Sequence, residues 1–330
     1  MQHTSEYLFL CTRIKSLERN LLGREQMERM LEARSNEEAL DVLTECGYEE
    51  LPEATAESID QALALQREKV MTDLAGMAPD PEVVNAFKVR YDYHNVKVLL
   101  KSDAMGVDPE PLLVDTGRVP VKELAEKVRS NDMNGLPPIL QAAAAAAKEV
   151  LANTGDPQQT DFILDRAFYV DMDDIAQQAG SEFLRGYVRI SVDAANLRSV
   201  VRTLRMGKGM DFLRGVLFEG GNIDVGRILN AVTSGGSLED LYATSMLRPA
   251  AEEAVHILGG GPLTRFEKLT DDAVTEYLSG AKYIAFGEAP VIAFLAAKEN
   301  EFTAVRIIMT GRMAGLDTDT IRERLRESYV

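Results

Sequence analysis

Three copies of one short phrase lie about a hundred residues apart in this chain. In each copy an acidic residue precedes a basic residue by five positions, and a glycine follows the base by nine. The copies begin at Asp92, Asp193 and Glu301, and they end at Gly106, Gly207 and Gly315. The basic positions are 101 and then 108 residues apart, so the repeat divides the 330 residues into three units of nearly equal size.

Each copy has the periodicity of a helix with one apolar face. Counted from the apolar residue before the base, positions zero, three and four share one side of an α-helix. They are Val96, Leu99 and Leu100, then Leu197, Val200 and Val201, then Val305, Ile308 and Met309. We expect each unit to bury this face in its own core. We also expect each glycine to end its helix in the left-handed conformation, which costs a residue with a Cβ atom roughly 1 kcal/mol.

Helical periodicity extends over nearly every long segment of the chain. Alternating patterns of β-branched and polar residues between tight turns are hard to find, so strands are not expected. We therefore predict an all-α protein made of three similar helical units, over residues 1–113, 114–216 and 217–330. The middle unit is the least regular of the three.

The composition excludes several functional classes. The net charge is -17, so the average surface repels nucleic acid and anionic bilayers. Two cysteines and three histidines occur without metal-ligand spacing, and we expect no metal or cofactor. The N-terminus lacks a signal-peptide pattern, and no run of eighteen apolar residues occurs. We predict a cytosolic protein that binds no nucleic acid and reaches a membrane only through another protein.

The polar residues of the repeated phrase are the candidate contact sites. An acid and a base five residues apart lie about 140° apart around a helix, so they cannot form an ordinary ion pair along it. They are either surface or inter-unit charges, or they line a shared surface for a partner. The candidate residues are Asp92, Asn95, Lys97, Asp193, Asn196, Arg198, Lys298, Glu299, Glu301 and Arg306.

A polar turn from Lys298 to Glu301 interrupts an otherwise apolar helix that opens at Pro290. Four consecutive polar residues reach every side of a helix, so at least one of them points toward the packed face. A buried polar group needs hydrogen-bond partners. The turn is therefore either solvated or part of a polar network inside the protein or at an interface.

Longer stretches of the chain resemble a known family. The segments Tyr93–Leu100 and Asp193–Arg202, and above all the segment Ala296–Arg312, are similar to the C subunit of the archaeal and vacuolar-type rotary ATPases. They also resemble the related d subunit of the vacuolar proton pump. The resemblance runs the full length and is strongest near the C-terminus. The third copy departs from the pattern, with Ala304 in place of asparagine and Glu301 in place of aspartate.

The resemblance implies an all-helical, funnel-shaped protein of three similar domains around a pseudo-threefold axis, with no active site. It implies a central-stalk subunit on the cytoplasmic face of a membrane. Such a subunit receives the shaft subunits D and F, sits on the ring of proteolipid subunits, and couples ATP chemistry to proton or sodium transport. The ten candidate residues are then inter-unit or shaft contacts.

Two alternatives stay open at this point. One is a free-standing α-helical scaffold of solenoid type, whose units stack in a row. The other is a helical enzyme that uses Glu299 or Glu301 as a buried acid beside Lys298.

Overall fold

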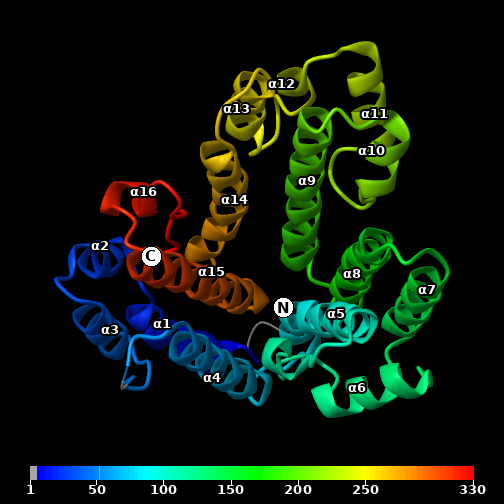
Figure 1. Ribbon diagram of the computed structural model, residues 1–330. Helices are drawn as coiled ribbons and strands as arrows, with labels where there is room; N and C mark the ends of the chain where they lie inside the picture. Colours follow the sequence, from blue (N-terminus) through cyan, green and yellow to red (C-terminus); the bar gives the residue numbers. More distant parts are fainter. Residues whose placement is uncertain (1–5, 52) are drawn as a thin grey trace.

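The structure is a computed structural model that describes residues 6–51 and 53–330. The first five residues of the predicted unit 1–113 lie outside the described residues, as does residue 52. Within the described ranges every regular element is a helix, which confirms the prediction of an all-α protein. Figure 1 shows how these helices are arranged.

The helices follow one another with short connections. The N-terminal part contains α1 (Leu8–Leu17), η2 (Glu18–Asn20), α2 (Arg24–Glu32), α3 (Asn36–Glu45), α4 (Ala56–Ala75) and α5 (Glu82–Met105). The middle part contains η3 (Glu110–Leu112), α6 (Val121–Ser130), α7 (Pro138–Thr154), α8 (Pro157–Gln178) and α9 (Glu182–Arg205). The last part contains α10 (Met210–Val216), α11 (Val225–Ser234), α12 (Leu238–Leu241), α13 (Arg248–Leu258), α14 (Thr264–Ser279), η4 (Gly280–Tyr283), α15 (Glu288–Met313) and α16 (Thr318–Arg322).

The three longest helices, α5, α9 and α15, each contain one copy of the repeated phrase. They have 24, 24 and 26 residues. The glycines that follow them, Gly106, Gly207 and Gly315, have φ angles of 66°, 62° and 70°. These angles lie in the left-handed region that glycine adopts without steric cost. The predicted glycine caps are confirmed.

The apolar face of each long helix is buried, as predicted. The face of α5 packs chiefly on α6 and α8, and that of α9 on α10, α13 and α14. The face of α15 packs on Met30, Leu43 and Leu63 near the other end of the chain. With the predicted boundaries, the faces of α5 and α15 lie against helices of another unit, and the face of α9 lies partly so. The face of α5 covers helices of the predicted second unit, and that of α9 covers α10 of its own unit and α13 and α14 of the third. The N-terminal helices of the predicted first unit cover the face of α15.

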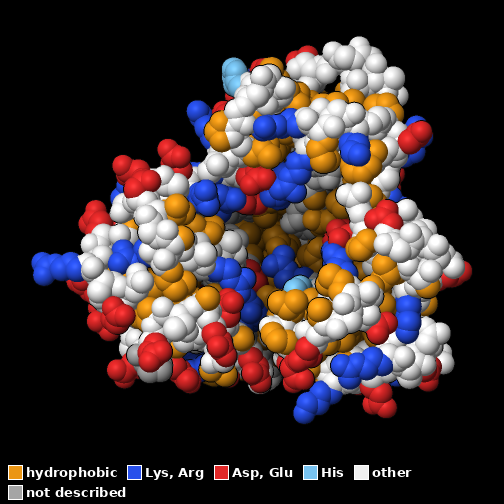
Figure 2. Space-filling view, in the orientation of Figure 1, with side chains coloured by type: hydrophobic (Ala, Val, Ile, Leu, Met, Phe, Trp, Pro, Cys, Tyr) orange, Lys and Arg blue, Asp and Glu red, His pale blue; other side chains and the backbone are white. Residues whose placement is uncertain are grey.

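The N-terminal halves of the three long helices meet in one hydrophobic cluster. Phe87 of α5, Leu184 of α9 and Phe294 of α15 all belong to it. The ring of Phe87 stacks on that of Tyr187, with centroids 5.7 Å apart. From this junction the three helices run outward (Figure 1), and the face of the molecule in Figure 2 is hollowed in the middle.

Candidate functional site

The three acids of the repeated phrase lie inside the protein, where each binds the backbone just ahead of another helix. Asp92 and Asp193 are fully buried, and Glu301 is 3% exposed. Each carboxylate accepts a hydrogen bond from an amide two residues before α6, α11 or α2. The pairs are Asp92 with Val119 at 3.1 Å, Asp193 with Ile223 at 3.1 Å, and Glu301 with Leu22 at 2.8 Å. The three acids therefore perform the same structural task.

The asparagines of the phrase bind the same loops. Asn95 accepts from the amide of Val114 at 2.9 Å and donates to its carbonyl oxygen at 2.8 Å. Asn196 makes the same two bonds to Phe218, both at 2.8 Å. These side chains replace the backbone partners that an irregular segment lacks. Ala304 occupies this position in the third copy and has no polar side chain with which to repeat the pair.

Glycine in two of the loops makes room for the carboxylate. A Cβ atom at Gly117 would lie 2.2 Å from an oxygen of Asp92, and one at Gly221 would lie 2.2 Å from an oxygen of Asp193. Neither glycine has a positive φ angle. The need for space, and not the backbone conformation, therefore explains why glycine occupies these two positions. In the third loop the equivalent residue is Asn20. The acid of this copy, Glu301, has one methylene group more than aspartate.

The first and third carboxylates each have a cationic partner. The Arg118 guanidinium contacts Asp92 at 2.7 Å and Asp171 at 2.7 and 3.0 Å. Glu301 accepts from the Lys298 ammonium at 2.7 Å and from the Tyr48 hydroxyl at 2.5 Å. These charge-assisted bonds compensate part of the cost of burying the acids.

The second carboxylate is held differently. Among the described residues, the hydrogen bonds to Asp193 come only from uncharged donors, the amides of Asn222 and Ile223. Burial raises the pKa of Asp193, and these bonds offset part of the shift. Burial also raises the pKa of Asp92, against the opposing effect of Arg118. The repeat therefore preserves the position of the acid but not the means of stabilising its charge.

The bases of the phrase form three equivalent ion pairs. Each base binds an aspartate on a helix that comes just before another of the long helices in the chain. These helices are α8 before α9, α14 before α15, and α4 before α5. Lys97 pairs with Asp165 of α8 at 2.5 Å, Arg198 with Asp271 of α14 at 2.6 Å, and Arg306 with Asp60 of α4 at 2.6 Å. These aspartates are not among the residues predicted from the sequence, although they recur at intervals of 105 and 106 residues.

The polar turn from Lys298 to Glu301 is buried, with Asn300 alone exposed. Glu299 accepts from the Tyr91 hydroxyl at 2.7 Å, and it lies 3.6 Å from the guanidinium groups of Arg67 and Arg90. These contacts connect α15 to α4 and α5. The turn is thus part of an internal polar network, and the solvated interpretation is wrong.

The ten candidate residues differ in their access to solvent. The three acids and two asparagines of the phrase, together with Lys298 and Glu299, are at most 9% exposed. The side chains of Lys97 and Arg198 are each 24% exposed, and that of Arg306 is 56% exposed. Each acid-to-loop bond and each ion pair of the phrase joins residues that the predicted boundaries place in different units. A contact with a shaft stays a prediction for all ten.

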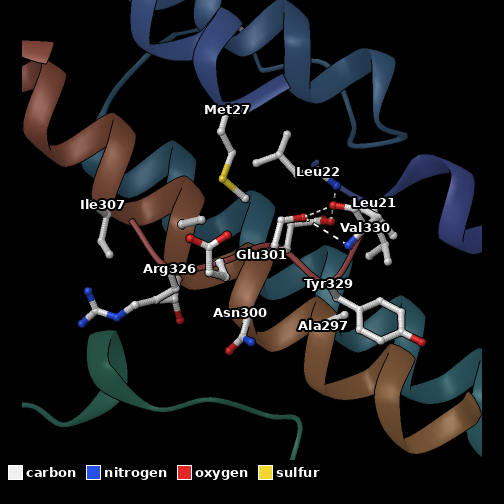
Figure 3. A pocket seen from close by; sticks show the side chains of 14 residues that line it. Leu21, Leu22, Met27, Ala297, Asn300, Glu301, Ile307, Arg326, Tyr329 and Val330 are labelled. Atoms are coloured by element: carbon white, nitrogen blue, oxygen red, sulfur yellow. Dashed lines mark hydrogen bonds between the residues drawn. The ribbon is translucent and has the colours of Figure 1, made fainter. Parts of the chain in front are cut away.

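The pocket beside Glu301 is small. Its volume is about 20 Å³, which is room for roughly one water molecule. Figure 3 shows Glu301 pointing toward Leu22, with the C-terminal residues Arg326, Tyr329 and Val330 across the pocket. The polar contacts here fix the loop before α2 onto α15, whereas Arg326 and the amide of Glu327 bind Asp271 and Asp272 of α14.

Two further observations concern metals and membranes. Within the described ranges, no three His, Cys, Asp or Glu side chains form a group that could hold a metal ion. None of the helices described is both long enough and apolar enough to span a bilayer.

Several known proteins are similar in sequence to this chain. Residues 10–324 match the family model described as ATP synthase (C/AC39) subunit. The chain is 24% identical over 326 residues to the C subunit of the V-type sodium ATPase of Enterococcus hirae, covering 98% of this chain and 99% of that protein. It is 25% identical over 351 residues to the C subunit of the A-type ATP synthase of Methanocaldococcus jannaschii, covering 97% and 86%. For the C subunit of the V-type ATP synthase of Thermus thermophilus the identity is 25% over 288 residues, covering 81% and 82%. These matches confirm the resemblance seen in the sequence.

Proposed function

Since this chain belongs to the ATP synthase (C/AC39) subunit family, we propose that it is a non-catalytic central-stalk subunit of an A/V-type ATPase. It couples the shaft subunits D and F to the membrane ring of proteolipid subunits, on the cytoplasmic face of the membrane. Through this coupling, ATP chemistry is linked to the transport of protons or sodium ions. The observation that carries the proposal is the family match over nearly the whole chain.

The proposal includes three similar units around a pseudo-threefold axis. It is supported by the three equivalent carboxylate-to-loop bonds and by the three equivalent ion pairs. We place each long helix in one unit with the helices that cover its apolar face. The units are then residues 82–178, residues 182–279, and residues 22–75 together with 288–330. The last unit is assembled from both ends of the chain.

The hollow in Figure 2 supports a funnel that receives a shaft. Basic, acidic and apolar side chains surround it in this view, and the three long helices run outward from the junction (Figures 1 and 2). A rod-shaped partner that enters the hollow would touch all three units. Torque would then act on the whole subunit and not on one flexible arm.

Co-purification tests the proposed role. The tagged full-length chain, recovered from native membranes with mild detergent, should bring with it the shaft subunits and the proteolipids. Recovery of the chain alone would overturn the role. Purified D and F subunits should also form a complex with the isolated chain in gel filtration.

The two alternatives fit the contacts less well. In a solenoid each repeat contacts only its neighbours, whereas here α15 packs on α2, α3 and α4. Solution scattering separates the two shapes, because a closed arrangement gives a compact particle and a row of units gives an elongated one. The acid proposed for an enzyme, Glu301, already accepts from Leu22, Tyr48 and Lys298. Unchanged assembly with loss of a small-molecule turnover in Glu301→Gln would be needed to restore that hypothesis.

A further inference from the structure

The C-terminal segment after α16 is extended, and two of its side chains are buried. Residues 325–330 contain no helix or strand. Leu325 is 7% exposed and Tyr329 is 5% exposed. A terminal segment of this kind is ordered only where the protein around it binds it. We refer to residues 325–330 as the strap.

Polar contacts bind the strap to α14. The Arg326 guanidinium donates to the Asp271 carboxylate at 2.6 Å. The backbone amide of Glu327 donates to the Asp272 carboxylate at 2.8 Å. The Lys268 ammonium also lies 3.2 Å from the Glu327 carboxylate. Two ion pairs and one backbone hydrogen bond thus attach two consecutive residues of the strap to one helix.

Other contacts bind the strap to η4, to α15 and to the segment before α2. The ring of Tyr329 lies 4.9 Å from the Lys282 ammonium of η4. Figure 3 shows Tyr329 and Val330 at the same pocket as Ala297 of α15 and Leu21. The strap therefore connects α14 to the part of the chain that packs around α15.

The two helices that the strap connects, α14 and α15, meet at a bend in the chain. α14 ends at Ser279 and α15 begins at Glu288, and the helices run in different directions (Figure 1). Between them, Gly287 has a φ angle of 116°, which glycine adopts without the strain of a Cβ atom. Tyr283 is 93% exposed and Phe286 is 45% exposed, so neither aromatic ring of this connection is buried. Hinge motions are absorbed by short connections of this kind. We refer to residues 280–287 as the elbow.

The strap is attached to α14 at a distance from the elbow. Asp271 lies nine residues before Gly280, which is roughly 13 Å along a helix. A contact at that distance opposes bending more effectively than a contact at the elbow itself, because its lever arm is longer. A direct hydrogen bond between the two helices, from Asn300 to Thr275, is uncharged and measures 3.3 Å.

The start of α15 is attached to its surroundings without the strap. The Cys11 thiol donates to the carbonyl oxygen of Gly287 at 3.3 Å, and the Ser181 hydroxyl donates to Glu288 at 2.9 Å. Leu278, just before the elbow, belongs to the hydrophobic cluster in which the three long helices meet. The elbow is therefore a pivot that stays in place, and the movement left free is that of α14 around it.

We propose that the strap sets the angle between α14 and α15, and that its release lets the unit of residues 182–279 turn around the elbow. The carboxylate of Asp271, to which Arg326 of the strap binds, also accepts from Arg198, a base of the repeated phrase. A partner that contacts Arg198 would therefore act on the attachment of the strap. The proposal goes beyond the proposed function and does not depend on it, because it concerns motion within one chain.

Distances between spin labels test this movement in the full-length protein. Labels on Asp41→Cys of α3 and Ser234→Cys of α11 occupy exposed positions in the two units that the elbow joins, and both native cysteines are buried. The variant Arg326→Ala/Tyr329→Ser removes the ion pair with Asp271 and the buried ring. It should shift or widen the distribution of distances between the labels. An unchanged distribution would overturn the proposal.

Matched controls separate release of the strap from a general loss of stability. The conservative variant Arg326→Lys/Tyr329→Phe keeps the charge and the ring, and it should keep the wild-type distances. Arg202→Ala removes an ion pair between α9 and α14, at 2.7 Å, that does not include the strap, and it should also keep them. A shift of equal size in Arg202→Ala would contradict the proposal. A label pair within one unit, Asp41→Cys/Thr72→Cys, should give the same distance in every variant, because a change there would place the movement outside the elbow.

Hydrogen exchange of the wild type is a second test, which applies even if the strap variant does not fold. The strap and the elbow should open together, so the amides of Glu327 and Ile284, which are bonded in the strap and in the elbow, should show the same free energy of opening. The amide of Leu22, bonded to α15, should show a higher one. If Glu327 opens only with Leu22, the strap is released only on unfolding and the proposal is wrong. Neither experiment contains a shaft subunit or a proteolipid, so neither result bears on the coupling role.

Discussion

Glu301 on α15 accepts a hydrogen bond from the amide of Leu22, a residue 279 positions earlier in the chain. The equivalent bonds at Asp92 and Asp193 span only 27 and 30 positions. The same carboxylate-to-amide bond therefore joins segments close in sequence at Asp92 and Asp193. At Glu301 it joins the two ends of the chain. The third bond closes the chain into a ring of contacts without a covalent link.

Glu301→Ala should be among the most destabilising single changes in the protein. It removes the acceptor of Leu22 and Tyr48 and leaves the buried Lys298 ammonium without its acid. Removing one partner of a buried ion pair typically costs about 3–5 kcal/mol. Urea denaturation would measure the change in the free energy of unfolding. The double variant Lys298→Met/Glu301→Leu should recover part of the loss, since no unpaired charge is left. A cost below about 1 kcal/mol for Glu301→Ala would contradict the role of this bond.

The helices and their ends follow from local sequence. The positions of Val96, Leu197 and Val305 and of the glycines after them specify a helix, its buried face and its left-handed end, because these features depend on residues within a few turns. The sequence also indicated that the acids and bases of the phrase face different neighbours. Helix geometry is sufficient for that conclusion.

The partners of the phrase could not be deduced in the same way. Asp92, Asp193 and Glu301 bind backbone amides, which every residue except proline possesses, so no residue type marks Val119, Ile223 or Leu22. The pairing of α15 with the N-terminal helices has no signal in a linear repeat, because the repeat only shows which segments are alike. The even spacing of Asp60, Asp165 and Asp271 is visible in the sequence. It identifies them as partners of the bases only when the helices that pack against each other are known.

Gly221→Ala tests the steric account of the glycine in the second loop. The new methyl group would lie 2.2 Å from a carboxylate oxygen of Asp193, and the Asp193 side chain is fixed by three hydrogen bonds. Crowding of this kind typically costs about 1–3 kcal/mol. Thermal and urea denaturation should both show the loss.

Gly215→Ala is the matched control for that change. A Cβ atom at Gly215, within α10, would meet no atom within 4 Å. Alanine is favoured over glycine in a helix by up to about 1 kcal/mol, so this variant should be neutral or stabilised. Equal destabilisation of both variants would refute the steric explanation.

Asp271→Ala should lower the free energy of unfolding more than Asp60→Ala does, although the two aspartates pair with equivalent bases of the repeated phrase. Asp271 binds Arg198 at 2.6 Å and also Arg326 of the C-terminal segment at 2.6 Å. Of the residues that the structure describes, only Arg306 binds Asp60, and both of those side chains are more than half exposed. Exposed pairs contribute under about 1 kcal/mol, and we expect roughly twice that loss at the partly exposed Asp271. Proteolysis of the C-terminus should also accelerate in Asp271→Ala only. Identical behaviour of the two variants would show that the contact with Arg326 contributes no stability.

Tyr48→Phe should change how stability depends on alkaline pH. Burial raises the pKa of Tyr48 well above its usual range, and the charge of Glu301 raises the pKa further. The folded protein keeps this proton while the unfolded chain loses it near pH 10. The stabilisation is therefore complete below about pH 10 and is lost as pH rises, at up to about 1.4 kcal/mol per pH unit for one proton.

The phenylalanine variant should be less stable than the wild type at neutral pH, because it lacks the hydroxyl that donates to Glu301 at 2.5 Å. A hydrogen bond to a charged group contributes about 1.5–3 kcal/mol. Above pH 10 the difference between the two proteins should shrink, since only the wild type has this proton to lose on unfolding. Free energies of unfolding from urea titrations between pH 8 and pH 11 would show the convergence. Parallel curves over this range would mean that the Tyr48 hydroxyl ionises equally in the folded and unfolded chains, and that its bond to Glu301 does not keep it protonated.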